Sequence, residues 1–322
     1  MKRQLLGVAA ILLSISTYAQ DNPLWMRYCA ISPDGTTIAF TYKGDIYTVP
    51  STGGRASQIT TNPAHDTKPI WSPDGKKIAF ASDRMGSMDI FEVNKEGGIP
   101  KRLTTHSGNE TPVAYKDAGH ILFLANIMPT VEDAQFPSGQ FQQVYEVNTE
   151  GGRPALFSSM PMEDISINHT GNTLLYHDKK GYEDPWRKHH TSSITRDIWL
   201  CSLNGNRTFR KQTTFNGEDR TPVWASDDKS FYYLSEEKGS FNIFKRDIDG
   251  NTSKQITNHT KHPVRFLSAA SNGTLCYGYD GEIYTVKEGA IPQKVQISIV
   301  TDKNDKDLIR QIKRSGATEI SL

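Results

Sequence analysis

The sequence predicts an all-β fold, a six-bladed β-propeller built from four-stranded antiparallel blades. A short polar–aliphatic–aromatic phrase occurs six times, and the steps between its central aliphatic residues are 44, 54, 54, 45 and 40 residues. A repeat of this length is typical of propeller blades. Turn-forming residues also recur at one fixed point of each repeat. The six copies are Asp45-Ile46-Tyr47, Asp89-Ile90-Phe91, Gln143-Val144-Tyr145, Asp197-Ile198-Trp199, Asn242-Ile243-Phe244 and Glu282-Ile283-Tyr284.

The second repeat shows the four expected strands most clearly. Residues 68–71 form a short apolar strand, and the Ser-Pro-Asp-Gly stretch at 72–75 is a tight turn, because proline presets φ and glycine accepts a positive φ. Residues 77–81 and 89–93 alternate in the manner of strands, and 101–104 supply the fourth. The other repeats follow the same order with more variable turns.

The repeats define six blades at about 26–60, 61–104, 105–157, 158–213, 214–257 and 258–300. Because the first and last blades each supply four strands of their own, no strand is left for exchange across the ring junction. We therefore expect closure without strand exchange, through side-chain packing between these two blades. This seam should be the weakest in the ring, and hydrogen exchange should show it opening first.

Both ends of the chain differ from the repeats. Residues 1–19 combine a charged start, a short apolar run and small residues before Ala19, which indicates a signal peptide and an exported, periplasmic or otherwise extracytoplasmic protein. A buried N-terminal helix is the alternative. Residues 301–322 indicate a linker and the first strand of a second, truncated propeller, or else a frayed natural C-terminus.

Composition excludes several classes of function. The 322 residues carry 37 basic and 36 acidic side chains, so no positive excess is available to bind nucleic acid, and no later stretch is long enough to span a membrane. Cys29, Cys201 and Cys276 lack the spacing of a disulfide framework or zinc site, so we expect buried thiols and no bound metal or cofactor.

No catalytic motif is present. The sequence has neither a G-x-S-x-G nucleophile elbow nor an H-E-x-x-H helix, so no catalytic residue is assigned. Asp34 and Asp74 could be carboxylates of a site, but hydrogen bonding within their Asp-Gly turns explains them better.

Two long insertions, at about 126–140 and 178–195, fall between the second and third strands of blades 3 and 4. Such loops emerge on one face of the ring, where binding usually resides. The second insertion carries aromatic and basic residues that suit peptide or partner binding. A loop that merely covers the ring is the alternative. The candidate binding residues are Tyr182, Trp186, Arg187, His189 and His190.

Four acidic residues precede or begin the first strand of successive blades: Asp66, Glu110, Asp164 and Asp219. They could form an acidic collar at the channel mouth, which would attract positively charged peptide termini and exclude acidic ones. Hydrogen bonds that order the loops are the alternative. Neutralising Asp66, Glu110 and Asp219 together would then change stability but not peptide binding.

The Ser-Pro-Asp-Gly-x-x-Ile-Ala-Phe repeat resembles the blades of Tol-system and dipeptidyl-peptidase propellers. Residues 31–54 and 181–199 further resemble the N-terminal six-bladed propeller of tricorn-type serine peptidases, in an exported version. This resemblance implies a large modular peptidase, with a seven-bladed propeller, a PDZ-like domain and a serine-type catalytic core after this region. It implies that the propeller guides peptides to or from the active chamber of a homo-oligomer.

The family's catalytic segments are missing from these 322 residues, so we expect the chain alone not to hydrolyse peptide bonds. Two rival functions stay open. One is a non-enzymatic envelope scaffold like the Tol propeller, although that family places an α/β domain before its blades. The other is the propeller of a dipeptidyl-peptidase-like α/β-hydrolase. The downstream gene sequence would separate all three.

Overall fold

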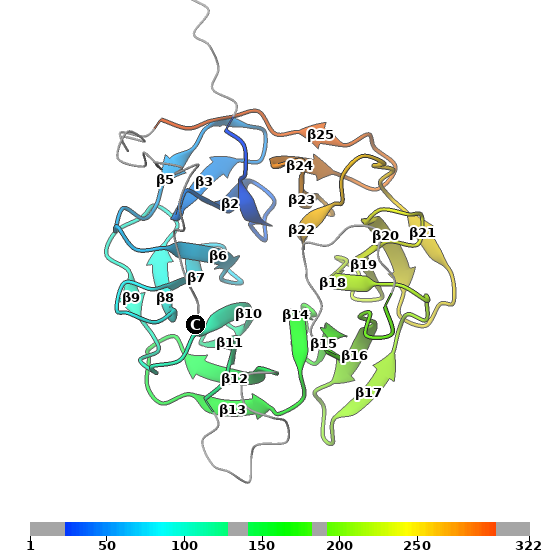
Figure 1. Ribbon diagram of the computed structural model, residues 1–322, viewed down its shortest axis with the longest axis horizontal. Coiled ribbons are helices and arrows are strands. Elements are labelled where there is room, and N and C mark those ends of the chain that lie inside the picture. Colours follow the sequence, from blue (N-terminus) through cyan, green and yellow to red (C-terminus); the bar gives the residue numbers. More distant parts are fainter. Residues whose placement is uncertain (1–22, 128–140, 182–191, 301–322) are drawn as a thin grey trace, which may run out of the picture.

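A computed structural model describes residues 23–127, 141–181 and 192–300. Six four-stranded antiparallel sheets are arranged radially about a central channel (Figure 1), and the described residues contain no helix. The predicted six-bladed propeller is therefore confirmed. The predicted signal peptide at 1–19 and the tail at 301–322 lie outside the described residues.

Each blade runs from an inner strand at the channel to an outer strand at the rim (Figure 1). Blade 1 comprises β1 (Arg27–Ile31), β2 (Thr37–Tyr42), β3 (Asp45–Pro50) and β5 (Ser57–Gln58). Blade 2 comprises β6 (Asp66–Trp71), β7 (Lys77–Ser82), β8 (Asp89–Asn94) and β9 (Lys101–Arg102). Blade 3 comprises β10 (Thr111–Asp117), β11 (His120–Ala125), β12 (Gln143–Asn148) and β13 (Ala155–Ser158).

The second half of the ring repeats this plan. Blade 4 comprises β14 (Met162–Ile167), β15 (Thr173–Asp178), β16 (Ile198–Ser202) and β17 (Thr208–Lys211). Blade 5 comprises β18 (Asp219–Trp224), β19 (Ser230–Ser235), β20 (Asn242–Asp247) and β21 (Ser253–Gln255). Blade 6 comprises β22 (Arg265–Ala269), β23 (Leu275–Tyr279), β24 (Glu282–Val286) and β25 (Gln293–Lys294).

The repeated phrase opens the third strand of every blade, and its central aliphatic side chain is fully buried. In four blades the backbone N–H of this aliphatic residue donates to a threonine hydroxyl just beyond the fourth strand, for example Ile46 to Thr60 at 3.0 Å and Ile90 to Thr104 at 2.9 Å. The phrase is therefore a structural repeat: its aliphatic side chain fills the core, and its N–H ties the outer edge of the blade.

Every inner strand contains a register shift against its neighbour. In five of them the shift holds a non-glycine residue in the left-handed region, with φ between 48° and 57°. Blade 3 has Pro112 at the corresponding place, where the proline ring fixes a negative φ. Such bulges re-aim a side chain and recur next to functional sites. The five left-handed residues are Tyr28, Lys68, Asp164, Thr221 and Phe266.

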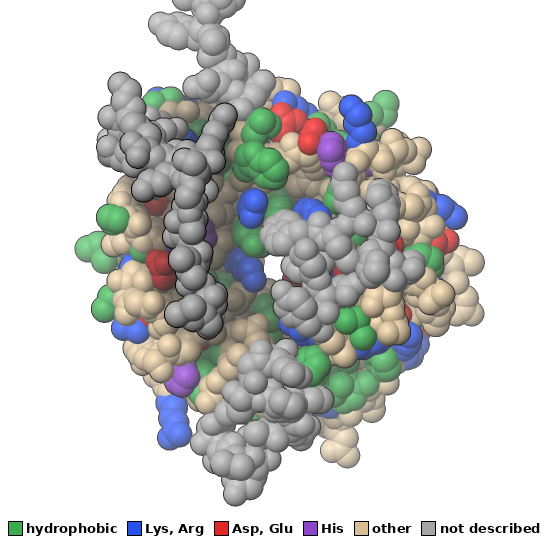
Figure 2. All heavy atoms as spheres, in the orientation of Figure 1, with side chains coloured by type: hydrophobic (Ala, Val, Ile, Leu, Met, Phe, Trp, Pro, Cys, Tyr) green, Lys and Arg blue, Asp and Glu red, His purple; other side chains and the backbone are tan. Residues whose placement is uncertain are grey.

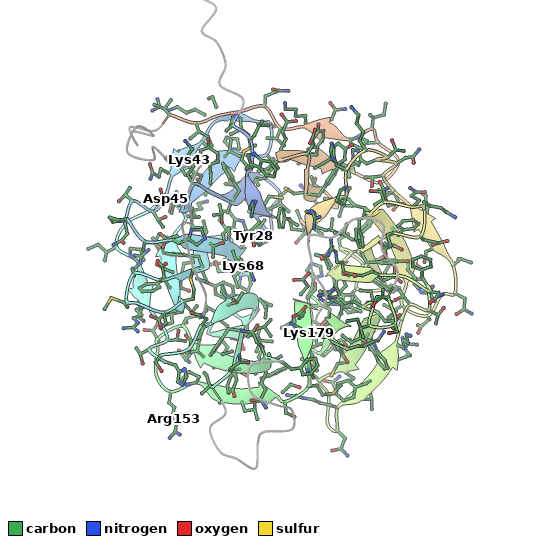
Figure 3. The ribbon with its side chains drawn as sticks, in the orientation of Figure 1. Tyr28, Lys43, Asp45, Lys68, Arg153 and Lys179 are labelled. Atoms are coloured by element: carbon green, nitrogen blue, oxygen red, sulfur yellow. The ribbon has the colours of Figure 1, made fainter. Side chains whose placement is uncertain are left out.

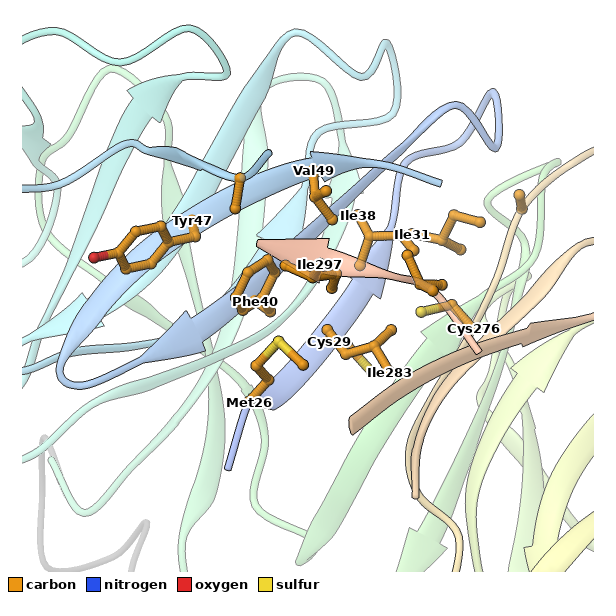
Figure 4. Packing of buried hydrophobic residues seen from close by; sticks show 13 residues of the cluster. Met26, Cys29, Ile31, Ile38, Phe40, Tyr47, Val49, Cys276, Ile283 and Ile297 are labelled. Carbon is orange, nitrogen blue, oxygen red and sulfur yellow. The ribbon is translucent and has the colours of Figure 1, made fainter. Parts of the chain in front are cut away.

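The ring closes between blades 1 and 6 without a shared blade strand. A single apolar cluster spans this seam and includes Cys29 and Phe40 from blade 1 and Cys276 and Ile283 from blade 6 (Figure 4). This is the packing that the sequence predicts.

The structure adds a backbone contact at this seam that the sequence analysis did not anticipate. Strand β26 (Ile297–Ser298) pairs in parallel with β4 (Gly54–Arg55) at the rim of blade 1. The N–H of Gly54 donates to the carbonyl of Gln296 at 2.8 Å, and that of Ala56 donates to Ser298 at 2.9 Å. A short peripheral clasp therefore supplements the apolar cluster.

Candidate functional site

A cavity of about 750 Å³ occupies the central channel and is lined by residues of all six inner strands. Figure 2 shows the opening from one face, with Lys and Arg side chains beside it. A cavity of this size is in the range that holds small ligands or a short peptide segment.

The bulges of the inner strands place side chains on the channel wall. All five left-handed residues line the cavity, and so does Pro112 on β10, the inner strand of blade 3. Figure 3 shows Tyr28 and Lys68 on one side of the channel and Lys179 across it. Each blade therefore presents to the channel one strand residue whose type differs from blade to blade. These residues help to determine which chemical groups the channel wall offers.

Blade 4 contributes a carboxylate surrounded by several basic side chains. Glu163 on β14 lies 2.7 Å from the Lys179 ammonium and 3.2 Å from Nε2 of His177, with Nε of Arg196 3.6 Å away. Burial by itself raises the pKa of Glu163, but the contacts with His177 and Lys179 outweigh it and hold that pKa well below its usual range.

Blades 4 and 5 bring two guanidinium groups onto one carboxylate. Nη1 of Arg196 lies 3.0 Å and Nη1 of Arg220 lies 3.4 Å from Oε1 of the fully buried Glu218. The Arg220 guanidinium also stacks 4.1 Å from the centroid of the Phe241 ring. Both arginines line the channel although each is less than one-tenth exposed.

An aromatic pair lines the channel between blades 1 and 6. The rings of Tyr28 and Phe266 lie 4.8 Å apart, and the Lys68 ammonium lies 5.8 Å from the Tyr28 ring centroid. Burial lowers the pKa of Lys68, while the nearby Asp164 and Glu163 carboxylates oppose that shift. The wall here combines apolar surface with positive charge.

The structure separates the four residues of the predicted acidic collar. Asp66, Glu110 and Asp219 are buried between strands, and each has a local partner. Asp66 accepts two bonds of 2.9 Å from Nη2 of Arg84, and Glu110 accepts from the Thr104 hydroxyl. This placement matches the alternative in which these acids order the loops.

Asp164 alone among the four lines the cavity, where its carboxylate accepts a 2.7 Å hydrogen bond from the Thr221 hydroxyl. The charged residues of the wall are mainly cationic, including Lys68, Lys179 and Arg196. The described channel wall therefore carries more basic than acidic side chains.

The candidates of the blade 4 insertion, Tyr182, Trp186, Arg187, His189 and His190, lie outside the described residues. Sequence reasoning missed the basic channel residues, because it looked for function in loops. An alignment of the six inner strands on their bulges could have found some of them: Lys68 occupies a bulge, and Arg220 and Arg265 each directly precede one.

Other kinds of site find no support in the part of the chain that the structure describes. No cluster of His, Cys, Asp or Glu there could hold a metal ion, and no helix there has the length and apolarity to cross a bilayer. The three thiols are buried in apolar clusters between neighbouring blades.

Comparison with known proteins identifies a family for this chain. The tricorn protease N-terminal beta propeller domain matches residues 23–290. The chain is 26% identical over 281 residues to tricorn protease homolog 1 of Streptomyces coelicolor, covering 86% of this chain and 25% of that protein. It is also 26% identical over 296 residues to a tricorn protease homolog of Saccharolobus solfataricus, covering 87% and 26%.

Solved structures agree at the level of the fold. The crystal structure of the tricorn protease superposes with a TM-score of 0.72 at 20% identity, over 88% of this chain and 27% of that one. TolB from Acinetobacter baumannii gives 0.59 at 14% identity, over 82% and 61%. The chain spans about a quarter of the length of the curated tricorn relatives.

Proposed function

This chain belongs to the family of tricorn protease N-terminal β-propellers, and from that premise we propose that it binds and gates peptides for a tricorn-like serine peptidase. Its central channel is the binding site, and peptide bonds are cleaved by other segments of a longer protein. The downstream domains and a homo-oligomeric assembly are the partners in this proposal.

The observation that carries the proposal is the lining of the channel. Five of the six inner strands hold a left-handed non-glycine residue at their bulge, and all five of these residues lie on the wall of a cavity of about 750 Å³. A left-handed conformation costs free energy at every such residue, on the order of 1 kcal/mol. Backbone strain that recurs in five strands around the channel axis is expected where the residues of the channel wall have a functional role.

The wall offers what an extended peptide needs. Guanidinium and ammonium groups can bind its carbonyls and carboxylates, and the Tyr28–Phe266 pair can contact an apolar side chain. Because Lys68, Arg220 and Arg265 lie on inner strands rather than loops, these groups are held in place before a peptide arrives.

Site-specific photo-crosslinking tests this proposal. A photoreactive amino acid at Thr221, on the channel wall, should capture a mixed library of short peptides. The same group at Arg153, on the outer surface away from the channel (Figure 3), should capture far less. Equal labelling at both positions, or none at Thr221, would refute peptide binding in the channel. Mass spectrometry of the captured peptides should find them intact.

We further propose that the protein is exported, on the pattern of its first nineteen residues. Expression in a Gram-negative host should place the chain in the periplasmic fraction, with an N-terminus that starts after Ala19. Recovery of the uncleaved chain in the cytosol would contradict this.

A further inference from the structure

Two of the three cysteines lie in the seam where the ring closes. Cys29 belongs to β1 of blade 1 and Cys276 to β23 of blade 6, and both are buried in the single apolar cluster that spans the seam (Figure 4). Cys201, the third, lies in the cluster between blades 3 and 4, which contains no second cysteine. The seam therefore brings together two thiols from opposite ends of the described ring.

Hydrogen bonds fix the position of the strands that carry these two thiols. Strand β1 packs against both β22 and β23 of blade 6. The Cys29 thiol donates to the carbonyl of Phe266 at 3.5 Å, and the N–H of Ile31 donates to the Ser268 hydroxyl at 3.0 Å. Ser268 lies directly opposite Cys276 in the β22–β23 pairing, and its hydroxyl donates to the Cys276 carbonyl at 3.4 Å. Cys29 is therefore held against the part of blade 6 that carries Cys276.

The two thiols differ in how a reagent can reach them. Cys29 is among the residues that line the channel cavity, whereas Cys276 is completely buried. Burial raises the pKa of the Cys276 thiol well above its usual range, and the nearby Cys29 thiol adds to that shift. An oxidant in the channel would therefore meet Cys29 first, and Cys276 would react second, when the seam opens.

We propose that Cys29 and Cys276 form a disulfide bond that latches the ring across the junction between blades 1 and 6. The oxidant is itself a disulfide, RSSR. The Cys29 thiolate attacks one of its sulfurs and releases RS⁻, and the Cys276 thiolate then attacks the Cys29 sulfur of the mixed disulfide and releases the second RS⁻. The two protein thiols together lose two protons and two electrons, and the oxidant is reduced to two RSH.

Such a bond would close a seam that no blade strand bridges. It would cross-link a loop of about 250 residues, and long loops gain most from a cross-link because it restricts the unfolded chain. It would also hold the channel wall, since Cys29 directly follows Tyr28, whose ring lies 4.8 Å from that of Phe266 on blade 6. The proposed export would bring the chain to a compartment where disulfides persist. Formation of the bond does not depend on peptide binding.

Oxidation of the full chain tests this latch. The reduced protein is incubated with oxidised glutathione under native conditions. Intact-mass measurement should then show the loss of two hydrogen atoms, and digestion without reductant should give a peptide pair joined through Cys29 and Cys276. The melting temperature should rise by about 5–10 °C, and amide exchange in β1 and β23 should slow. Dithiothreitol should reverse both changes.

The matched variants are Cys276→Ala, which removes one partner, and Cys201→Ala, which removes a buried thiol outside the seam. In Cys276→Ala the oxidant should leave the melting temperature unchanged, and a glutathione adduct should accumulate at Cys29. Cys201→Ala should respond as the wild type does. If Cys276→Ala fails to fold, the peptide map of the unaltered protein still identifies which cysteines are joined.

Three results would overturn the latch. The first is a lasting glutathione adduct at Cys29 of the unaltered protein, because Cys276 would then fail to reach the mixed disulfide. The second is a disulfide that includes Cys201. The third is recovery of unreacted Cys29 and Cys276 even in urea just below the unfolding transition, where the seam should open most readily. None of these results bears on peptide binding, which photo-capture at Thr221 tests separately.

Discussion

At the scale of single residues, acids at equivalent points of successive blades have different surroundings. Asp66 is paired with Arg84, whose two bonds to it measure 2.9 Å. Glu110 is equally buried but accepts from the neutral Thr104 hydroxyl, and its Oε1 has no hydrogen-bond partner among the described residues. Burial therefore raises the pKa of Glu110 to about 7, against the weaker opposing bond from Thr104.

This raised pKa predicts a pH dependence of stability. The folded protein binds the Glu110 proton more tightly than the unfolded chain does, so the stability from this group is fully present below about pH 4 and is lost as the pH rises through about 7. Glu110→Gln stays neutral and keeps an acceptor for Thr104. It should be more stable than the wild type by about 1–3 kcal/mol near pH 8 and nearly equal near pH 4. Urea unfolding at both pH values measures this.

Asp66→Asn is the control for that prediction. It breaks a buried ion pair, so it should lower the free energy of unfolding by about 3 kcal/mol at neutral pH. The free energies of unfolding of Glu110→Gln and of the wild type could instead differ by the same amount at both pH values. That result would show that Glu110 is ionised in the folded protein, contrary to the prediction.

At the scale of the strand, the inner strands are tied to one another by tryptophan. Nε1 of Trp71 on β6 donates to the carbonyl of Ala30 on β1 at 2.8 Å, and Nε1 of Trp224 on β18 donates to Ser166 on β14 at 3.0 Å. Each indole thus carries a hydrogen bond from one blade to the preceding one, beside the bulge that lines the channel. Bulge and bond together hold the wall in register.

Trp71→Phe should therefore loosen the contact between blades 1 and 2. The loss of the indole N–H and part of its volume should lower the free energy of unfolding by about 1–2 kcal/mol. Amide exchange in β1 should accelerate. The matched control is Trp199→Phe, because Nε1 of Trp199 donates to Asp178 within its own blade, at 3.1 Å. Equal acceleration of β1 exchange in both variants would contradict an inter-blade role for Trp71.

At the scale of the whole molecule, the ring seam combines an apolar cluster with the β26–β4 clasp. The clasp depends on a close backbone approach at Gly53, where φ is 92° and an added Cβ would lie 2.6 Å from the carbonyl oxygen of Gln296. The same turn in blade 2 has Gly97 at φ 95°, where a Cβ would meet the Ile59 carbonyl at 3.5 Å. Only the first site lacks room for a side chain.

Gly53→Ala should open the seam, whereas Gly97→Ala should only cost the strain of a positive φ, about 1 kcal/mol. The buried thiols report on this opening. Cys29 and Cys276 lie in the seam cluster, and Cys201 lies in the cluster between blades 3 and 4. A thiol reagent should label the first two faster in Gly53→Ala, with Cys201 unchanged. Labelling of all three at one common rate would mean that the ring opens only by global unfolding.

The sequence by itself determined the number of blades, the strands within them and the absence of strand exchange. The alternation of apolar residues and the turn-forming residues are local features of the chain, and the same pattern occurs in all six repeats. It could not determine what faces the channel. A single bulged residue reverses the direction of a side chain, which is why Asp66 lies inside a blade while Lys68, two residues later, reaches the wall. The channel residues Arg196, Arg220 and Arg265 belong to three successive blades, and only the packing of blades 4, 5 and 6 around one axis places all three on the channel wall.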